Sequence, residues 1–180
     1  YRGLLADSRP RELETLSYTF RIGGASLACV THFARHRMLS PLFRPTLSAL
    51  NGYAYVLPDS IRKNPEAHAI YLDAMWDNAL EARAMAEGGL SPEDLSYYAL
   101  AGLTAEFLMT INARELLHFI KLRSCERAQW EIRSLTERMQ SALIRSFPDL
   151  FSLYGPSCRI DGACPEGRLS CGKPRPPICP

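Results

Sequence analysis

The chain has 180 residues, of which 47% are hydrophobic and 22% are charged, and its formal net charge is +2. This length allows one compact domain with a core, and the composition is typical of a globular protein. So mild a charge gives no reason to expect nucleic acid or a membrane surface as a partner. No apolar run approaches the roughly 18 residues of a membrane span, and no signal peptide is visible. We expect a cytoplasmic protein, although a chain that begins with tyrosine excludes targeting only weakly.

The first part of the chain alternates between strand and helix patterns. Residues 15–22 alternate and are rich in β-formers, which predicts a strand that the glycine pair at 23–24 ends. Residues 25–39 have helical spacing, with Met38 among the apolar positions. Pro41 and Pro45 then bound a predicted loop.

Residues 53–57 form a short strand or an extended segment that Pro58 closes, and a long helix is predicted after it. Proline at position 65 suits a first helical turn, and the pattern runs to about residue 86 before the glycine pair at 88–89. We expect its buried stripe to contain Leu72, Trp76 and Leu80.

The second half begins with a capping-box pattern at residues 91–94, which predicts a short helix. Residues 107–111 form a buried strand, and Asn112 can cap the helix after it. Another helix is predicted over residues 128–146, with apolar residues at helical spacing at Ile132, Leu135, Met139 and Leu143.

Short strands mixed with long helices predict an α+β fold, in which helices flank a sheet. From residue 155 onward glycine, proline and cysteine prevail and no periodicity remains. The predicted organisation is a main domain over residues 1–154 and a nonregular cysteine-rich tail over residues 155–180.

Cationic side chains gather at the end of the first predicted helix. Arg35, His36 and Arg37 are consecutive, His32 lies one turn earlier, and Arg44 follows in the loop. Clustered guanidiniums suit phosphate, because the planar fork binds two oxygens at once. Cations at a helix C-terminus also complement its dipole, and the triplet alone favours this second interpretation.

A second group of polar residues follows the buried strand. Arg114 and His118 are four residues apart and share a face of the helix that Asn112 caps. Arg123 is nine positions past Arg114, and at about 100° per residue it points to the opposite side. By itself, the group is read as a solvated stripe with a partly buried histidine.

Together the two stretches resemble the flavin-dependent thymidylate synthases, the ThyX family. That family has an Arg-His-Arg signature and a second segment similar to residues 107–133, which read NARELLHFIKLR from Asn112 and AQWEI from Ala128. The tail is similar to that of one bacterial branch. The resemblance implies that residues 1–154 are a ThyX-like catalytic domain.

The resemblance implies a specific reaction. Family members transfer a methylene group from methylenetetrahydrofolate to C5 of a uracil nucleotide, and FAD reduced by NADPH supplies a hydride. They are homotetramers with active sites at subunit junctions. Because one helix does not easily present Arg114, His118 and Arg123 to one pocket, we expect different subunits to supply the two faces.

The resemblance also assigns roles to residues. It implies that FAD is held by Arg35, His36, Arg37, Asn112, Arg114 and His118. It implies that Arg123 contacts the uracil and activates it. A guanidinium cannot act as a base, but it can stabilise negative charge on the ring. The candidate substrate-binding residues are His32, Ser40, Arg44 and Arg123.

This sequence departs from the family pattern at positions that bind the nucleotide or lie near it. Leu47 and Ser96 stand where the family has phosphate-binding arginines, His32 replaces a glutamine, and Thr15 replaces a histidine. One explanation is that Arg44, or a lysine or arginine of a partner subunit, compensates for the lost charge. The other is a changed substrate, and we rank UMP or a related uridine nucleotide, as in ThyX-like enzymes of polyoxin-type antibiotic pathways, slightly above dUMP. A flavin-binding paralogue without methylase activity is the alternative.

The cysteines suggest a different class of function. Cys29 and Cys125 lie in helical patterns, are read as reduced core residues and have no evident activating site, which argues against a cysteine-dependent thymidylate synthase. The tail cysteines, separated by five, six and seven residues, are Cys158, Cys164, Cys171 and Cys179. Structural zinc sites prefer cysteines two to four residues apart. We therefore expect no metal, and a zinc-binding interaction module is only a weak alternative.

Overall fold

A computed structural model describes residues 11–44 and 53–176. The chain divides into two compact units. The first unit comprises Tyr1–Phe20, His36–Ser40 and Thr110–Pro180, and the second comprises Arg21–Arg35 and Pro41–Met109. Within the described ranges, none of the helices combines the length and hydropathy that a membrane span requires.

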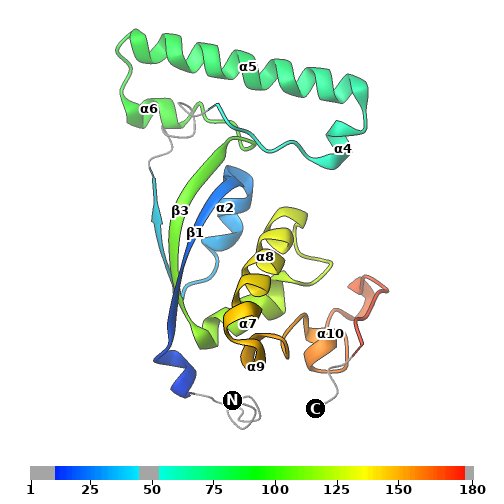
Figure 1. The fold of residues 1–180 in the computed structure, drawn as a ribbon. Coiled ribbons are helices and arrows are strands. Elements are labelled where there is room, and N and C mark those ends of the chain that lie inside the picture. Colours follow the sequence, from blue (N-terminus) through cyan, green and yellow to red (C-terminus); the bar gives the residue numbers. More distant parts are fainter. Residues whose placement is uncertain (1–10, 45–52, 177–180) are drawn as a thin grey trace. The chain divides into compact units, whose positions relative to one another are not determined.

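The first unit is built around two amphipathic helices, α7 (Ala113–Arg123) and α8 (Trp130–Ser146), which pack against each other (Figure 1). Smaller elements complete it: η1 (Arg11–Glu14) contacts α7, and α9 (Pro148–Phe151) contacts α8. The predicted nonregular tail contains two short helical turns, α10 (Ser157–Ile160) and η2 (Gly167–Leu169). The division at residue 154 stays a prediction.

Local sequence signals explain where α7 and α8 begin. The Asn112 side chain accepts a hydrogen bond from the Glu115 backbone amide at 2.9 Å, which confirms the predicted cap of α7. The Gln129 side chain caps α8 in the same way, so that helix begins at Trp130 and not at residue 128.

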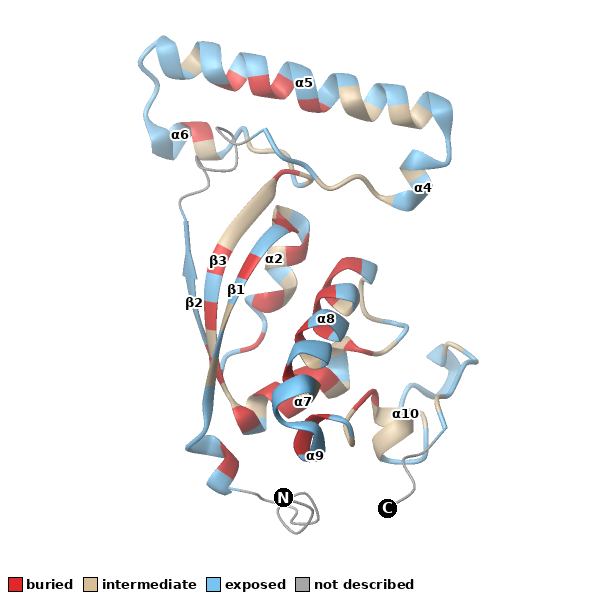
Figure 2. Ribbon diagram, in the orientation of Figure 1, coloured by how far each residue is buried: buried red, intermediate tan, exposed pale blue. Residues whose placement is uncertain are grey.

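The buried stripe of α8 is as expected, with Ile132, Leu135, Met139 and Leu143 all buried. Figure 2 shows buried residues concentrated in α7 and along one side of α8. Each fully buried apolar side chain of this size stabilises the fold by about 1.5–3 kcal/mol. Packing of these apolar faces therefore holds the first unit together.

Three strands form one sheet in the order β1-β3-β2, namely β1 (Ser17–Ser26), β3 (Thr104–Asn112) and β2 (Leu39–Phe43). Strands β1 and β3 are antiparallel: the Leu16 carbonyl accepts from the Ala113 amide at 2.8 Å, and the Thr19 and Thr110 hydroxyls are 2.9 Å apart. This confirms the expected α+β class and the buried strand before α7.

Two predictions around the sheet are wrong. The glycine pair at 23–24 does not end β1, because Gly24, without a Cβ, adopts a φ of +74° inside the strand. Pro41 is not in a loop but in β2, an edge strand, where a missing N–H is tolerated. Pro45 lies outside the described residues.

The second unit contains α2 (Leu27–Phe33), α4 (Asp59–Arg62), α5 (Pro65–Glu87) and α6 (Pro92–Ser96). The α2 helix stops at Phe33, well before the predicted residue 39, because the chain turns to enter β2 and sheet pairing overrides helical spacing. Met38 is consequently 65% exposed. The predicted extended segment at residues 53–57 is confirmed only in part: Tyr55 forms one antiparallel bridge to Leu103, whereas Tyr53 has a φ of +48°.

The buried face of α5 differs from the predicted one. Trp76 is 67% exposed and Leu80 is 51% exposed, and Leu72 is only partly buried. The residues that turn inward instead are Met75, Asn78, Ala79 and Ala82. The prediction chose the face with the largest apolar side chains, whereas Met75 and Ala82 are the α5 residues that form a buried cluster with Leu95 and Leu103.

Caps at both ends of the α5–α6 connection are as expected. Gly88 is the C-cap of α5, and the Ser91 hydroxyl accepts from the Asp94 backbone amide at 3.1 Å at the start of α6. The side-chain nitrogen of buried Asn78 donates to the Tyr98 carbonyl at 2.8 Å, whereas its Oδ1 atom has no hydrogen-bond partner among the described residues. The contact from Asn78 connects α5 to the segment that follows α6 within the second unit.

Candidate functional site

The Arg-His-Arg triplet lies in the turn after α2, and only its middle residue is buried. His36 is 7% exposed, whereas Arg35 and Arg37 are both exposed. His36 and Arg37 belong to the first unit, together with all of α7. The helix-end position predicted for the triplet is therefore confirmed only in part, since α2 ends two residues before Arg35.

Both ring nitrogens of His36 are engaged by side chains of α7. Nε of Arg123 donates to Nε2 of His36 at 2.9 Å, and Nδ1 of His36 lies 3.1 Å from Oε1 of Glu115. A guanidinium N–H can only donate, so Nε2 must be the acceptor. Nδ1 therefore carries the proton and donates it to the Glu115 carboxylate. His36 is a neutral imidazole between an anion and a cation.

The electrostatics agree with this tautomer. Burial is the largest influence and lowers the pKa of His36 below its ordinary value of 6.5. The hydrogen bond to Glu115 opposes this shift, while the charge of Arg123 adds to it. Protonation of Nε2 would remove the acceptor of Arg123 and bring two cations together. The neutral form is therefore stable near neutral pH.

The spacing of residues along α7 explains why three side chains of this helix contact His36. Glu115, Phe119 and Arg123 are spaced four residues apart and lie on one face. The Phe119 ring packs against the His36 ring at an interplanar angle of 57°, with ring centroids 4.6 Å apart. Glu115 is a site residue that sequence reasoning missed, although its four-residue spacing from Phe119 and Arg123 was a usable signal.

Arg114 and Arg123 face different partners, as expected from their separation. Arg114 forms an ion pair with Glu14 of η1. The expectation that His118 and Arg123 are directed apart is wrong, because the His118 ring is 6.5 Å from the His36 ring that Arg123 contacts. Long helical side chains extend back toward the N-terminus, which brings Arg123 over the turn that carries Phe119. One chain therefore places His118 and Arg123 beside the same group.

Asn112 is less available than the resemblance implies. Its side-chain oxygen caps α7 by accepting from the Glu115 amide. The cap uses one lone pair of this oxygen, so the second lone pair and the amide nitrogen are left for a ligand. The same contact fixes the backbone of Glu115, so Asn112 also supports the His36 arrangement.

The expected nucleotide residues are divided between the two units. Ser40 is exposed in β2 and belongs to the first unit, while His32 and Arg44 belong to the second. Nη1 of Arg44 lies 3.8 Å from Glu106, which also pairs with Arg21. The Arg44 side chain remains 67% exposed, so it can still meet an anion.

The substituted phosphate positions are only partly described. The Ser96 hydroxyl donates to the Glu93 carbonyl at 2.7 Å inside α6, so it is occupied locally and carries no charge. Leu47 lies outside the described residues.

One of the two cysteines predicted to lie in helices is found elsewhere. Cys29 is fully buried, as expected, but Cys125 lies in the loop between α7 and α8 and not in a helix. Cys179 lies outside the described residues. Within the part of the chain that the structure describes, no group of three or more His, Cys, Asp or Glu side chains is placed to hold a metal ion.

Comparison with known sequences identifies close relatives. The family model described as "Thymidylate synthase complementing protein" matches residues 1–149. The flavin-dependent thymidylate synthase of Geobacter sulfurreducens is 37% identical over 164 residues, which cover 89% of this chain and 70% of that protein. The Clostridium tetani enzyme of the same description is 32% identical over 187 residues, covering 94% and 75%.

Comparison with solved structures supports the same fold. The UMP/dUMP methylase PolB from Streptomyces cacaoi, bound with 5-Br dUMP, superposes with a TM-score of 0.72 at 22% identity, covering 86% of this chain and 78% of that one. ThyX from Helicobacter pylori with FAD and dUMP gives a TM-score of 0.66 at 22% identity, covering 83% and 78%.

Proposed function

This chain belongs to the flavin-dependent thymidylate synthase family, and we propose that it methylates C5 of a uridine monophosphate, UMP or dUMP. Methylenetetrahydrofolate is the proposed carbon donor. FAD, when bound and reduced by NADPH, supplies the hydride. Two relatives described as flavin-dependent thymidylate synthases, at 37% and 32% identity, support this assignment.

The arrangement of Glu115, His36 and Arg123 carries the proposal at the level of residues. Arg123 is the proposed contact to the uracil, where its positive charge stabilises negative charge at N3 and O4 and so raises electron density at C5. The hydrogen bond from its Nε atom to His36 fixes the plane of the guanidinium. A fixed plane suits a group that must meet a flat ring, because orientation is set before the substrate arrives.

The exposed polar side chains of the first unit, arginines among them, fit a cofactor with a pyrophosphate. Arg37 and His118 are exposed, and the Arg114 side chain is 44% exposed beside Glu14. Arginine forks bind phosphate oxygens in pairs. The proposed FAD ligands are Arg35, Arg37, Asn112, Arg114 and His118. We assign His36 a positioning role, because both of its ring nitrogens are already engaged.

The proposed substrate preference is UMP over dUMP. Ser96 and Leu47 lack the charge of the arginines that hold the phosphate in the family pattern. Loss of one charged donor costs about 1.5–3 kcal/mol, so the nucleotide must be held differently. Arg44, exposed beside Glu106, is the proposed replacement, with Ser40 and His32 as further contacts.

We also propose that the enzyme works as a homotetramer with shared active sites and resides in the cytoplasm. The alternative is a paralogue that binds FAD without methylating a nucleotide. The two functions separate in one experiment with purified protein, FAD, NADPH and methylenetetrahydrofolate. Formation of a 5-methyl nucleotide from UMP or dUMP supports the methylase, whereas bound FAD without any methylated product contradicts it.

A further inference from the structure

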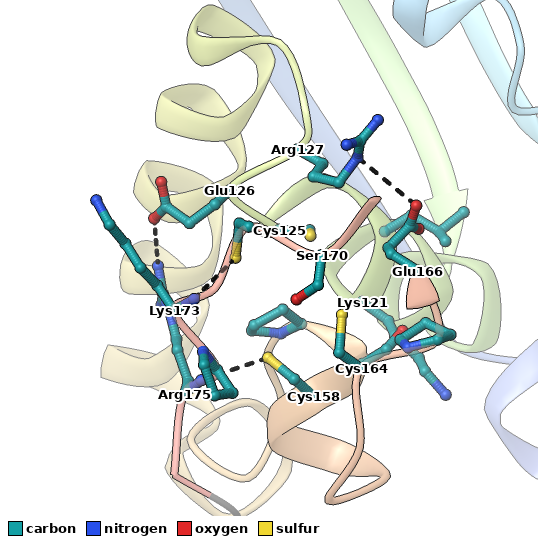
Figure 3. A pocket seen from close by; sticks show the side chains of 16 residues that line it. Lys121, Cys125, Glu126, Arg127, Cys158, Cys164, Glu166, Ser170, Lys173 and Arg175 are labelled. Atoms are coloured by element: carbon teal, nitrogen blue, oxygen red, sulfur yellow. Dashed lines mark hydrogen bonds and ion pairs between the residues drawn. The ribbon is translucent and has the colours of Figure 1, made fainter. Parts of the chain in front are cut away.

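Four cysteines line one pocket of the first unit (Figure 3). Cys125 comes from the loop between α7 and α8, Cys158 from α10, and Cys164 and Cys171 from the chain on either side of η2. The pocket has a volume of about 80 Å³, comparable to two or three water molecules. Thiols from four separate places therefore surround a space that is large enough for one ion.

Backbone amides donate to two of these sulfur atoms. The Lys173 amide lies 3.4 Å from Sγ of Cys171, and the Arg175 amide lies 3.4 Å from Sγ of Cys158. Hydrogen bonds from the protein to ligand atoms orient metal ligands and stabilise thiolates.

Cationic side chains lie among the residues that line the pocket. They are Lys121, Arg127, Lys173 and Arg175, alongside the acidic Glu126 and Glu166. A neighbouring cation favours the thiolate form of cysteine, which is the form that binds a metal.

The tail is held against the loop by contacts that do not involve sulfur. Lys121 of α7 pairs with Asp161 at 2.8 Å, and Nη1 of Arg127 donates to the Leu169 carbonyl at 2.7 Å. Arg175 lies 3.3 Å from Glu137 of α8. These contacts bring Cys158, Cys164 and Cys171 to the loop, so that a metal does not have to gather distant segments by itself.

We propose that Cys125, Cys158, Cys164 and Cys171 bind one zinc ion in a structural four-thiolate site. Four sulfur ligands in a tetrahedron are a common structural zinc set, and soft thiolates select zinc over magnesium or calcium. In the described structure no three of these side chains are placed to hold a metal together. The proposed site therefore requires rotation of the cysteine side chains about their Cα–Cβ bonds into the pocket that they line.

The site would tie the tail to the end of α7. Cys125 follows Arg123 by two residues, so a metal bound there restrains the segment that ends the helix. The sequence alone offered Cys179 as the fourth candidate ligand, and the proposed site has Cys125 instead. Zinc has no redox chemistry in this role, and the site adds structure, not a catalytic step.

The experiment measures metal in the full chain purified without chelator. Elemental analysis should find about one zinc per chain, and cobalt substitution should give the visible bands of tetrahedral Co²⁺ with thiolate-to-metal charge transfer. The intensity of the charge-transfer band reports four thiolates in the native chain. Cys125→Ser and Cys164→Ser should each reduce it to three thiolates and weaken zinc binding at least tenfold.

The matched control is Cys29→Ser, which alters a cysteine outside the pocket and should leave the zinc content and the cobalt spectrum unchanged. Three results would overturn the proposal: purified protein without zinc that also fails to take up cobalt, iron with the colour of an iron–sulfur cluster, or disulfides among these cysteines in a mass spectrum. Zinc binding that Cys125→Ser leaves unchanged would overturn the inclusion of the loop. The cobalt spectrum of the native chain needs no variant, so poor folding of a variant leaves the test intact.

Discussion

Arg123 reaches back along α7 so that its Nε atom donates to Nε2 of His36 at 2.9 Å. On the other side of the ring, Glu115 lies 3.1 Å from Nδ1. An imidazole that accepts from a guanidinium is neutral and cannot donate from the same nitrogen. The contact therefore links the protonation of His36 to the orientation of the guanidinium that we assign to the substrate.

Arg123→Lys should abolish most turnover while FAD stays bound. Lysine keeps the positive charge but has no planar fork and no Nε donor placed to meet His36. We expect kcat to fall at least a hundredfold with little change in the flavin content of the purified protein. Arg138→Lys, at an exposed position on α8, is the control and should behave like the native enzyme. Near-normal turnover in Arg123→Lys would rule out the role.

Arg114→Ala should weaken FAD binding. Removing one charged donor costs about 1.5–3 kcal/mol, which corresponds to roughly a ten- to hundredfold higher Kd. Fluorescence titration of the apoprotein with FAD measures this dissociation constant, and Arg138→Ala is the control. Because Arg114 also pairs with Glu14, Glu14→Gln separates the two effects: it should leave FAD affinity intact. Unchanged affinity in Arg114→Ala would remove this residue from the cofactor site.

His36 should make the stability of the protein depend on pH. Its pKa is lowered in the folded state, so below its ordinary value of 6.5 the unfolded chain takes up a proton first. The stabilising contribution is therefore complete above pH 6.5 and is lost as the pH falls toward the folded pKa. Urea unfolding at pH 8 and pH 5.5 should show a larger loss for the native chain than for His36→Gln. Equal losses would contradict the assignment.

The nucleotide preference is measured by comparing kcat/KM for UMP and dUMP under the same conditions. We expect the higher value with UMP. Arg44→Ala should raise the KM for the preferred nucleotide about tenfold or more, because it removes the proposed phosphate ligand. Arg62→Ala, an exposed arginine of α4, is the control. A clear preference for dUMP would reject the proposal on the sugar.

The proposal that subunits share active sites is examined by mixing variants. Arg114 pairs with Glu14, whereas Arg123 contacts His36, so the two arginines serve different surroundings in one chain. If they act from different subunits in catalysis, co-refolded Arg114→Ala and Arg123→Ala chains should regain part of the activity. Absence of recovery in verified mixed tetramers, or full activity in a verified monomer, would contradict shared sites.

The sequence by itself determined the elements that depend on near neighbours. The cap at Asn112, the stripe of α8 and the buried strand β3 follow from spacings of two to four residues, and all three are present. The Arg-His-Arg and NAR motifs likewise placed the chain in its family, which the relatives confirm. Because such signals depend on neighbouring residues alone, they can be interpreted without the tertiary structure.

Only the tertiary structure decided which distant residues meet. Glu115 and Arg123 are 79 and 87 positions from His36, and no periodic pattern relates them to it. Pairing at the sheet edge drew Pro41 into β2, and packing in the second unit chose Met75 over Trp76 as the buried face of α5. Cys125 lies in the loop between α7 and α8 and not in a helix, and it lines one pocket with three cysteines of the tail. Each outcome depends on a surface supplied by a remote segment, because burial and pairing, unlike helical spacing, are properties of two segments together.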